Sequence, residues 1–246
     1  MRVAVVTGAS SGIGAALCRE LRSRGWRTVG LSRRPAPDAD EHEPCDVADR
    51  AAVEAAAERV LARHPRIELL VNNAGVPGRV GYLDAGPEQL EELVATNYLG
   101  SVWCLRAFLP GLGAGAAVVN VASVAGVVAA GPYSASKHAQ LAFSRSVAIE
   151  LAPRGVHVLS VLPGYVETPG FPQRRRLGFP LRLVVVDPTL VARRTLDALE
   201  RRRREIVVPR WYRPAGWLQA LAPGLLTRRP ASLEPGRARS GSRARR

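Results

Sequence analysis

Short apolar runs alternate with longer helical stretches along most of this chain, and this alternation limits the fold more than any other feature. The first run, RVAVVTG at 2–8, is unbroken and rich in β-branched residues, which predicts a buried strand. Further strands are predicted over 27–32, 67–75, 115–123, 156–164 and 205–209, and helices over 11–25, 49–64, 87–112, 132–152 and 188–203. Such strand–helix–strand repeats predict an α/β fold in which a doubly wound parallel sheet carries helices on both faces.

The composition is that of an ordinary soluble globular protein, with 47% apolar and 23% charged residues in 246. Its three cysteines, Cys18, Cys45 and Cys104, are far apart and lack Cys-x-x-Cys spacing. This pattern indicates reduced thiols, no metal site and a cytoplasmic location. The N-terminal apolar run is too short for a secretory signal, and no uninterrupted apolar stretch reaches the roughly 18 residues of a membrane span.

The net charge of +14 does not indicate a nucleic-acid partner. Residues 228–246 contribute +6 of it through seven arginines and Glu234, and their Arg, Ser, Gly and Pro content predicts a disordered basic tail. The remaining charge is spread over many helices, without the concentrated basic face or reading motif of a nucleic-acid binder. We predict one domain over 1–208, which includes a substrate loop at 165–187, then an apolar extension at 209–227 and the tail.

A glycine motif, TGASSGIG, follows the first predicted strand and opens the first predicted helix. Gly8, Gly12 and Gly14 would let backbone amides approach a pyrophosphate at the positive end of the helix. The alternative is a tight turn that needs glycine only for its torsion angles. The strand before and the helix after favour a single Rossmann-type dinucleotide-binding sheet.

Tyr133 and Lys137, in the sequence YSASK, lie four residues apart, and Lys137 is the only lysine among 35 basic residues. Residues i and i+4 share one face of a helix. A nearby ammonium favours the phenolate form of tyrosine and brings this group into the range of acid–base catalysis at neutral pH. The alternative is an exposed tyrosine and lysine on a helix surface.

Together with NNAG at 72–75, YSASK at 133–137 and PG at 163–164, the TG-x3-G-x-G motif resembles the short-chain dehydrogenase/reductase family. The resemblance runs from about residue 2 to 208, with every motif in the family's order. It implies an oxidoreductase that moves a hydride between a nicotinamide cofactor and a carbonyl or secondary alcohol. It also implies a homodimer or homotetramer. The alternative is a non-catalytic, nucleotide-sensing relative. Loss of the tyrosine, the lysine or the serine would favour this alternative, but all three residues are present.

The resemblance implies two further catalytic residues. Ser123, at the end of the predicted strand 115–123, would hold the substrate oxygen beside Tyr133 and support developing negative charge. Asn97, inside a predicted helix, would interrupt that helix and anchor a water that relays protons through Lys137. Without the resemblance, the serine could be a turn former and the asparagine an exposed helix residue.

The end of the second predicted strand indicates that NADP(H) is preferred over NAD(H). It carries Ser32, Arg33 and Arg34, with no acidic residue before Asp38, whereas NAD-preferring folds place an acid there. An arginine fork matches a 2′-phosphate. The resemblance further implies that the cofactor contacts Gly8, Ser10, Ser11, Gly12, Ile13, Gly14, Asp46, Val47, Asn73, Ala74, Gly75, Tyr133, Lys137, Pro163, Gly164, Val166 and Thr168.

The substrate side is less determined by the sequence. The loops 76–83, 124–132 and 165–187 are mostly Val, Ala, Leu and Phe, which suits an apolar or acyl-bearing carbonyl compound but equally suits packing of a lid. The arginines at 174–176 could meet an anionic group, although a solvated charge run is the more ordinary interpretation.

Residues 209–229 carry Trp211, Tyr212, Trp217 and several leucines between arginines. This composition suits peripheral contact with a membrane surface. The alternative is packing on the enzyme's own substrate side or on a partner subunit. Pro214 and Pro223 would break a long amphipathic helix, which favours packing.

Overall fold

The computed structural model describes residues 1–221 except 79, 129, 130, 171, 175, 176, 178 and 180. The predicted tail, the last residues of the extension, and Arg175 and Arg176 of the charge run lie outside the described residues.

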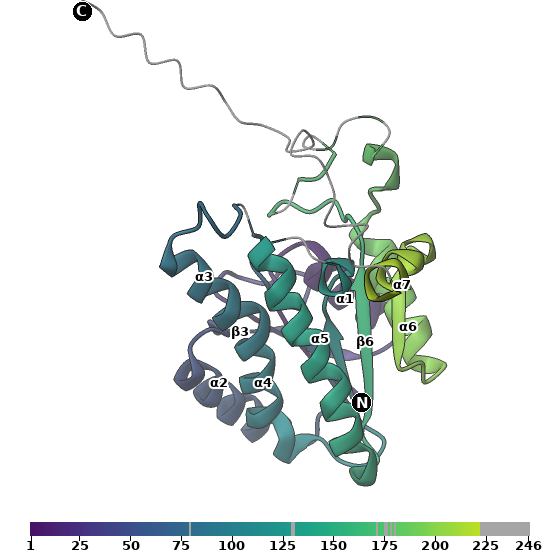
Figure 1. The fold of residues 1–246 in the computed structure, drawn as a ribbon. Coiled ribbons are helices and arrows are strands. Elements are labelled where there is room, and N and C mark those ends of the chain that lie inside the picture. Colours follow the sequence, from purple (N-terminus) through teal and green to yellow (C-terminus); the bar gives the residue numbers. More distant parts are fainter. Residues whose placement is uncertain are drawn as a thin grey trace, which may run out of the picture.

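A seven-stranded parallel sheet forms the centre of the molecule, with strand order β3-β2-β1-β4-β5-β6-β7 (Figure 1). The strands are β1 (Val3–Thr7), β2 (Arg27–Ser32), β3 (Glu41–Pro44), β4 (Leu69–Asn72), β5 (Ala117–Val121), β6 (His157–Pro163) and β7 (Glu205–Val208). Val5, in the inner strand β1, pairs with Val29 of β2 and with Leu70 of β4. The predicted doubly wound parallel sheet is confirmed.

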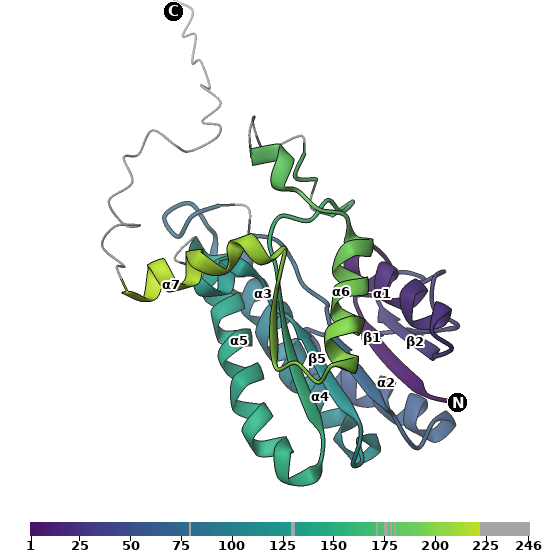
Figure 2. The same cartoon turned by 90° about the vertical axis from the view of Figure 1, so that its right-hand side faces the viewer.

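Helices cover both faces of this sheet (Figure 2). They are α1 (Gly12–Ser23), α2 (Arg50–Arg63), α3 (Pro87–Val94), α4 (Gly100–Phe108), α5 (Gly131–Leu151), α6 (Pro188–Glu200) and α7 (Arg213–Leu221). Side chains of α2, α4 and α5 pack on one face, and those of α1 and α6 on the other. Along β1, Val5 faces the first group while Ala4 and Val6 face the second, so both sides of the strand are apolar. Among the helices of the described ranges, none combines the length and apolarity that a membrane crossing requires.

The edge strand β3 was not predicted, because its sequence EHEP contains no apolar run. Ionic contacts hold it instead. The buried carboxylate of Glu43 accepts hydrogen bonds from Arg59 at 2.7 Å and from Arg63 at 2.9 Å, both on α2. Burial alone would raise the pKa of Glu43, but these two guanidinium groups hold it below its usual value.

The segment 87–112, predicted as one helix, is a continuous helical segment that contains more than one type of helix. A π-helical turn, Ala95–Leu99, separates α3 from α4, and a 3-10 turn ends the path at Leu109–Gly111. Asn97 lies in the π turn and is fully buried. Such turns are frequent at functional sites.

The sheet changes its winding direction between β1 and β4. The chain leaves β1 for α1 on one face and leaves β4 for α3 and α4, of which α4 packs on the other. Beyond the carboxyl ends of these two strands the connections diverge, which opens the crevice where ligands bind in folds of this kind.

Candidate functional site

A pocket of about 930 Å³ lies at the carboxyl edge of the sheet. Of the residues predicted to be catalytic or to bind the cofactor, it is lined by Gly8, Ser10, Ser11, Gly12, Ile13, Ser32, Arg33, Asp46, Val47, Asn73, Ala74, Gly75, Ser123, Tyr133, Lys137, Pro163, Gly164, Val166 and Thr168. Gly14 and Asn97 are predicted site residues that do not line it. Both lie directly behind its wall.

The glycine loop forms a cradle in which side chains would not fit. Gly8 and Gly12 have positive φ angles of 65° and 59°. A Cβ atom on Gly12 would lie 3.0 Å from Cγ2 of Thr168, and one on Gly14 would lie 2.2 Å from the carbonyl oxygen of Gly8. Gly14 therefore allows α1 to begin directly against the loop.

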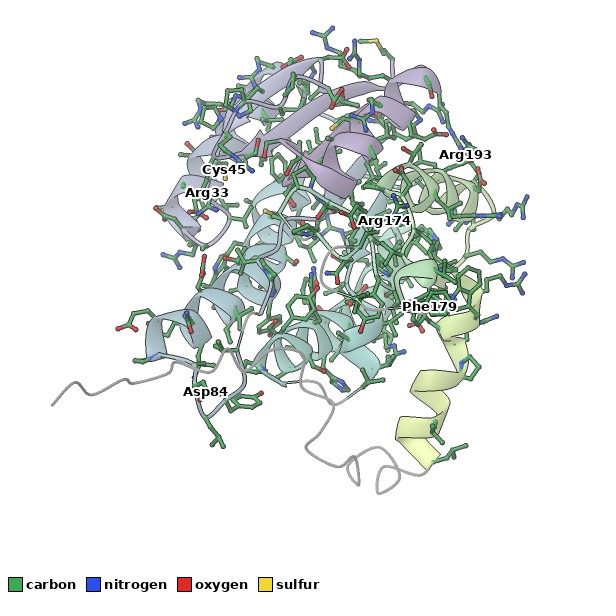
Figure 3. The ribbon with its side chains drawn as sticks, turned by 90° about the horizontal axis from the view of Figure 1, so that it is seen from above. Arg33, Cys45, Asp84, Arg174, Phe179 and Arg193 are labelled. Carbon is green, nitrogen blue, oxygen red and sulfur yellow. The ribbon has the colours of Figure 1, made fainter. Side chains whose placement is uncertain are left out.

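The predicted adenosine end of the pocket is bounded by the turn after β2 and the residues after β3. Arg33 lies 3.5 Å from the carboxylate of Asp46, and both side chains are largely accessible, at 66% and 41%. The hydroxyl of Ser32 donates to the carbonyl oxygen of Arg34 at 2.6 Å and shapes the turn. Arg34 also lines the pocket. Seen from above, Arg33 lies near Cys45 on the side of β2 and β3, far from Phe179 on the side of α7 (Figure 3).

Ser123 and Tyr133 meet at the predicted reaction centre and share a side-chain hydrogen bond. Ser123 begins the 3-10 turn Val124–Val127, and its hydroxyl accepts from the amide of Ala125 at 3.0 Å, which fixes its rotamer. Burial raises the pKa of Tyr133 above its ordinary value, although the hydrogen bond from Ser123 opposes this change. The phenol is therefore protonated at neutral pH and able to donate.

Lys137 lies one turn of α5 beyond Tyr133 and is 4% exposed. Its Nζ donates to the carbonyl oxygen of Val121 at 3.1 Å and to Oε1 of Gln140 at 2.8 Å. Burial lowers the pKa of Lys137 to about 7. A Cβ atom on Gly75 would lie 3.4 Å from this Nζ, so the loop after β4 passes directly over the ammonium group.

Asn97 holds that loop in place. Its Oδ1 accepts from the amide of Val76 at 2.8 Å, and its Nδ2 donates to the carbonyl oxygen of Val76 at 3.1 Å and to the hydroxyl of Ser136 at 3.0 Å. The prediction that Asn97 interrupts the helix agrees with the π turn. Its side chain, however, bonds to the protein and does not face the pocket.

Tyr212 and Leu218 line the pocket. They come from the segment for which packing on the substrate side is the favoured interpretation. A Cβ atom on Gly164 would lie 2.2 Å from Cε2 of Tyr212, so the glycine of the PG motif leaves room for this ring. Gln140, which no local sequence pattern indicates, contacts Lys137 from the next turn of α5. Arg174 of the predicted charge run is exposed and does not line the pocket.

The comparisons with known proteins agree with this geometry. A family model described as short chain dehydrogenase matches residues 2–176. The monensin polyketide synthase putative ketoacyl reductase of Streptomyces virginiae is 41% identical over 199 residues, which are 72% of this chain and 75% of that protein.

Two solved structures are also similar. A Burkholderia cenocepacia short chain dehydrogenase in complex with NADP superimposes with a TM-score of 0.75 and 26% identity, covering 84% of this chain and 95% of the other. A Burkholderia phymatum short chain dehydrogenase/reductase in complex with NAD gives a TM-score of 0.80 at 24% identity, with 96% of each chain covered.

The fold and the site together define a nicotinamide-dependent oxidoreductase that transfers a hydride between its cofactor and a carbonyl or alcohol. The chain belongs to the short-chain dehydrogenase/reductase family.

Proposed function

We propose that this enzyme reduces the carbonyl group of an apolar or acyl-bearing substrate and prefers NADPH to NADH. The observation that carries the proposal is the hydrogen-bonded pair Ser123–Tyr133, with Lys137 behind it, beside an apolar wall. That wall consists of Val124, Ala125, Val128, Tyr165, Tyr212 and Leu218. The name of the Streptomyces virginiae relative, a putative ketoacyl reductase, supports an acyl-bearing substrate.

In the reducing direction, the carbonyl carbon would receive a hydride that NADPH supplies when bound. Tyr133 donates its phenolic proton to the carbonyl oxygen, and the hydroxyl of Ser123 donates a hydrogen bond to the same oxygen as negative charge develops. The predicted lowering of the pKa of Tyr133 by Lys137 is not seen, since burial raises this pKa. Lys137 instead helps to restore the proton of the phenolate that remains after the transfer. We propose that residues 1–208 carry this chemistry and that 209–227 contribute to the substrate side.

The preference for NADPH rests on charge at the adenosine end. Arg33 and Arg34 line the pocket next to the end of β2, and Asp46 is the one carboxylate among the described lining residues. Because Asp46 lies 3.5 Å from Arg33, the two side chains neutralise each other in part before the cofactor binds. A 2′-phosphate would provide a stronger, charge-assisted partner for the guanidinium group.

The experiment that tests the function follows NADPH oxidation with a panel of carbonyl compounds. We expect turnover of apolar ketones and of β-ketoacyl thioesters, and little turnover of free sugars. Turnover of free sugars alone would contradict the substrate class. NADPH binding without turnover of any compound would instead favour the nucleotide-sensing alternative.

The homodimer or homotetramer stays a prediction. We propose that its surface is the groove of about 620 Å³ between α4 and α5, lined by residues such as Val102, Leu105 and Phe143. Light scattering of the purified protein tests this, and a monomeric mass at micromolar concentration would contradict it. The cytoplasmic location also stays a prediction.

For the extension, we propose packing on the enzyme's own substrate side rather than membrane contact. Tyr212 sits on Gly164 and makes an edge-to-face contact with Tyr165, with ring centroids 6.3 Å apart. A Cβ atom on Gly216 of α7 would lie 3.2 Å from Cγ2 of Val127. These contacts support packing of the segment at the mouth of the pocket.

We therefore expect Tyr212→Ala to raise KM for an apolar ketone about tenfold or more, the scale of lost apolar contact in a substrate pocket. The Kd of NADPH should stay unchanged. Trp211→Ala is the matched control, because Trp211 is 61% exposed and does not line the pocket. Equal kinetic effects of the two substitutions, or loss of sedimentation with anionic liposomes in Trp211→Ala, would support the membrane alternative instead.

A further inference from the structure

Gln140 is a buried polar side chain for which the proposed mechanism has no role yet. It lies one turn after Lys137 on α5 and has no accessible surface. Its Oε1 accepts from Nζ of Lys137 at 2.8 Å, and its Nε2 donates to the hydroxyl of Ser101 on α4 at 2.8 Å. The amide is therefore held at both ends. A reversed amide would turn its NH₂ group toward the ammonium, so Lys137 fixes the orientation.

Ser101 belongs to a wider buried polar cluster beneath the site. Its carbonyl oxygen accepts from Nδ2 of Asn72 at 3.4 Å, and the same Nδ2 donates to Oδ1 of Asn120 at 2.8 Å. Nδ2 of Asn120 then donates to the hydroxyl of Ser144 at 2.9 Å. These groups come from α4, β4, β5 and α5. These bonds tie the four elements together beneath the site, although Oδ1 of Asn72 has no hydrogen-bond partner among the described residues.

The surroundings of Lys137 make the acceptor on Gln140 important. The groups that face its Nζ are the carbonyl oxygen of Val121 from β5, the loop at Gly75 with Asn97 behind it, and Gln140 from α5 itself. No carboxylate is among them in the described part of the chain. Since a buried ammonium without a counter-ion is costly, each neutral acceptor contributes strongly to keeping it charged.

We propose that Gln140 is a positioning residue for catalysis, which holds Nζ of Lys137 beneath the loop at Gly75 and keeps it in the ammonium form. This inference rests on the proposed role of Lys137 in the proton transfer. Ser101 supports it by fixing the far end of the amide. Gln140 touches neither cofactor nor substrate, since it does not line the pocket.

The test compares Gln140→Met with Gln140→Glu in the full chain, measuring kcat/KM for carbonyl reduction against pH. Methionine has a similar shape but no comparable acceptor, so the ammonium should lose its proton at lower pH. We expect the alkaline limb of the profile to move down by about one pH unit, with kcat/KM at neutral pH about fivefold lower. Glutamate keeps an acceptor and adds a negative charge. This charge should move the alkaline limb of the profile to higher pH.

The matched control is Ser144→Ala, which breaks the buried cluster beyond Asn120 without a bond to Lys137. It should lower the thermal midpoint but leave the alkaline limb in place. Opposite shifts in Gln140→Met and Gln140→Glu support the proposal, because a purely structural role would not reverse sign. The proposal is overturned if the alkaline limb stays in place in the folded Gln140 variants, or if it moves in the same direction in both.

Lys137→Met separates this inference from the proposed function. If Lys137→Met keeps full activity, the proposed role of the lysine is wrong and the inference falls with it. If Lys137→Met is inactive while both Gln140 variants keep the wild-type profile, only the positioning role is wrong. Should Gln140→Met fail to fold by circular dichroism, the nearly isosteric Gln140→Glu decides alone: an upward shift supports the proposal and an unchanged profile overturns it.

Discussion

Tyr133→Phe is expected to lower kcat for carbonyl reduction by at least about 100-fold, the usual scale for a lost general acid. The substitution removes one oxygen and keeps the ring, and it leaves the close approach of Gly78 to Cβ of Tyr133 unchanged, since a Cβ atom on the glycine would lie 2.5 Å from it. The pocket should therefore keep its shape. We expect the Kd of NADPH to change by less than about twofold, so that the loss belongs to the chemical step.

Stopped-flow or steady-state measurement of NADPH oxidation, with fluorescence titration for the Kd, checks this result. Tyr98→Phe is the matched control, since Tyr98 lies in the π turn and packs edge-to-face on Phe143 at 6.3 Å. It should keep near wild-type kcat. Wild-type turnover by Tyr133→Phe would remove the tyrosine from the proposed mechanism.

The second large effect concerns the nucleotide. Arg33→Asp should reduce the preference for NADPH over NADH by roughly 10- to 150-fold, since a charge-assisted phosphate contact contributes about 1.5–3 kcal/mol. The new carboxylate would also face Asp46, which lies 3.5 Å from the present guanidinium group. Arg33→Ser separates the two causes, because it removes the arginine without adding a negative charge.

The ratio of kcat/KM for NADPH and NADH measures the preference in each variant. Arg193→Asp makes the same change of charge on α6, away from the pocket, and should leave the ratio unchanged (Figure 3). If the wild-type enzyme already used both nucleotides equally well, the assignment of Arg33 to a 2′-phosphate would be refuted.

The sequence predicted those parts of the molecule that depend on local pattern. Buried parallel strands such as β1 and β5 are short runs rich in valine, and the glycine loop carries its torsional requirements in its residues. The i, i+4 spacing brought Tyr133 and Lys137 together on α5. These features can be read within about ten residues of sequence.

The missed features depend on contacts between distant segments. The strand β3 forms because Glu43 meets Arg59 and Arg63, and no hydrophobic period marks such a pairing. Tyr212 reaches Gly164 from 48 positions along the chain, which only the tertiary fold can show. The sequence does not distinguish Gln140 from an exposed polar residue on a helix. Its burial follows from the packing of α5 against β5 and α4.

The ionic edge strand β3 has a consequence for how copies of this protein can meet. A sheet edge with free backbone groups invites another chain to add a strand, and proteins prevent this with short edges, charges and proline. β3 has all three, since it is four residues long, carries Glu41 and Glu43, and ends at Pro44. A strand that paired with β3 would have to break the ion pairs between Glu43 and its two arginine partners on α2. This border of the sheet therefore resists fibrous aggregation, and ordered self-association has to use other surfaces of the molecule.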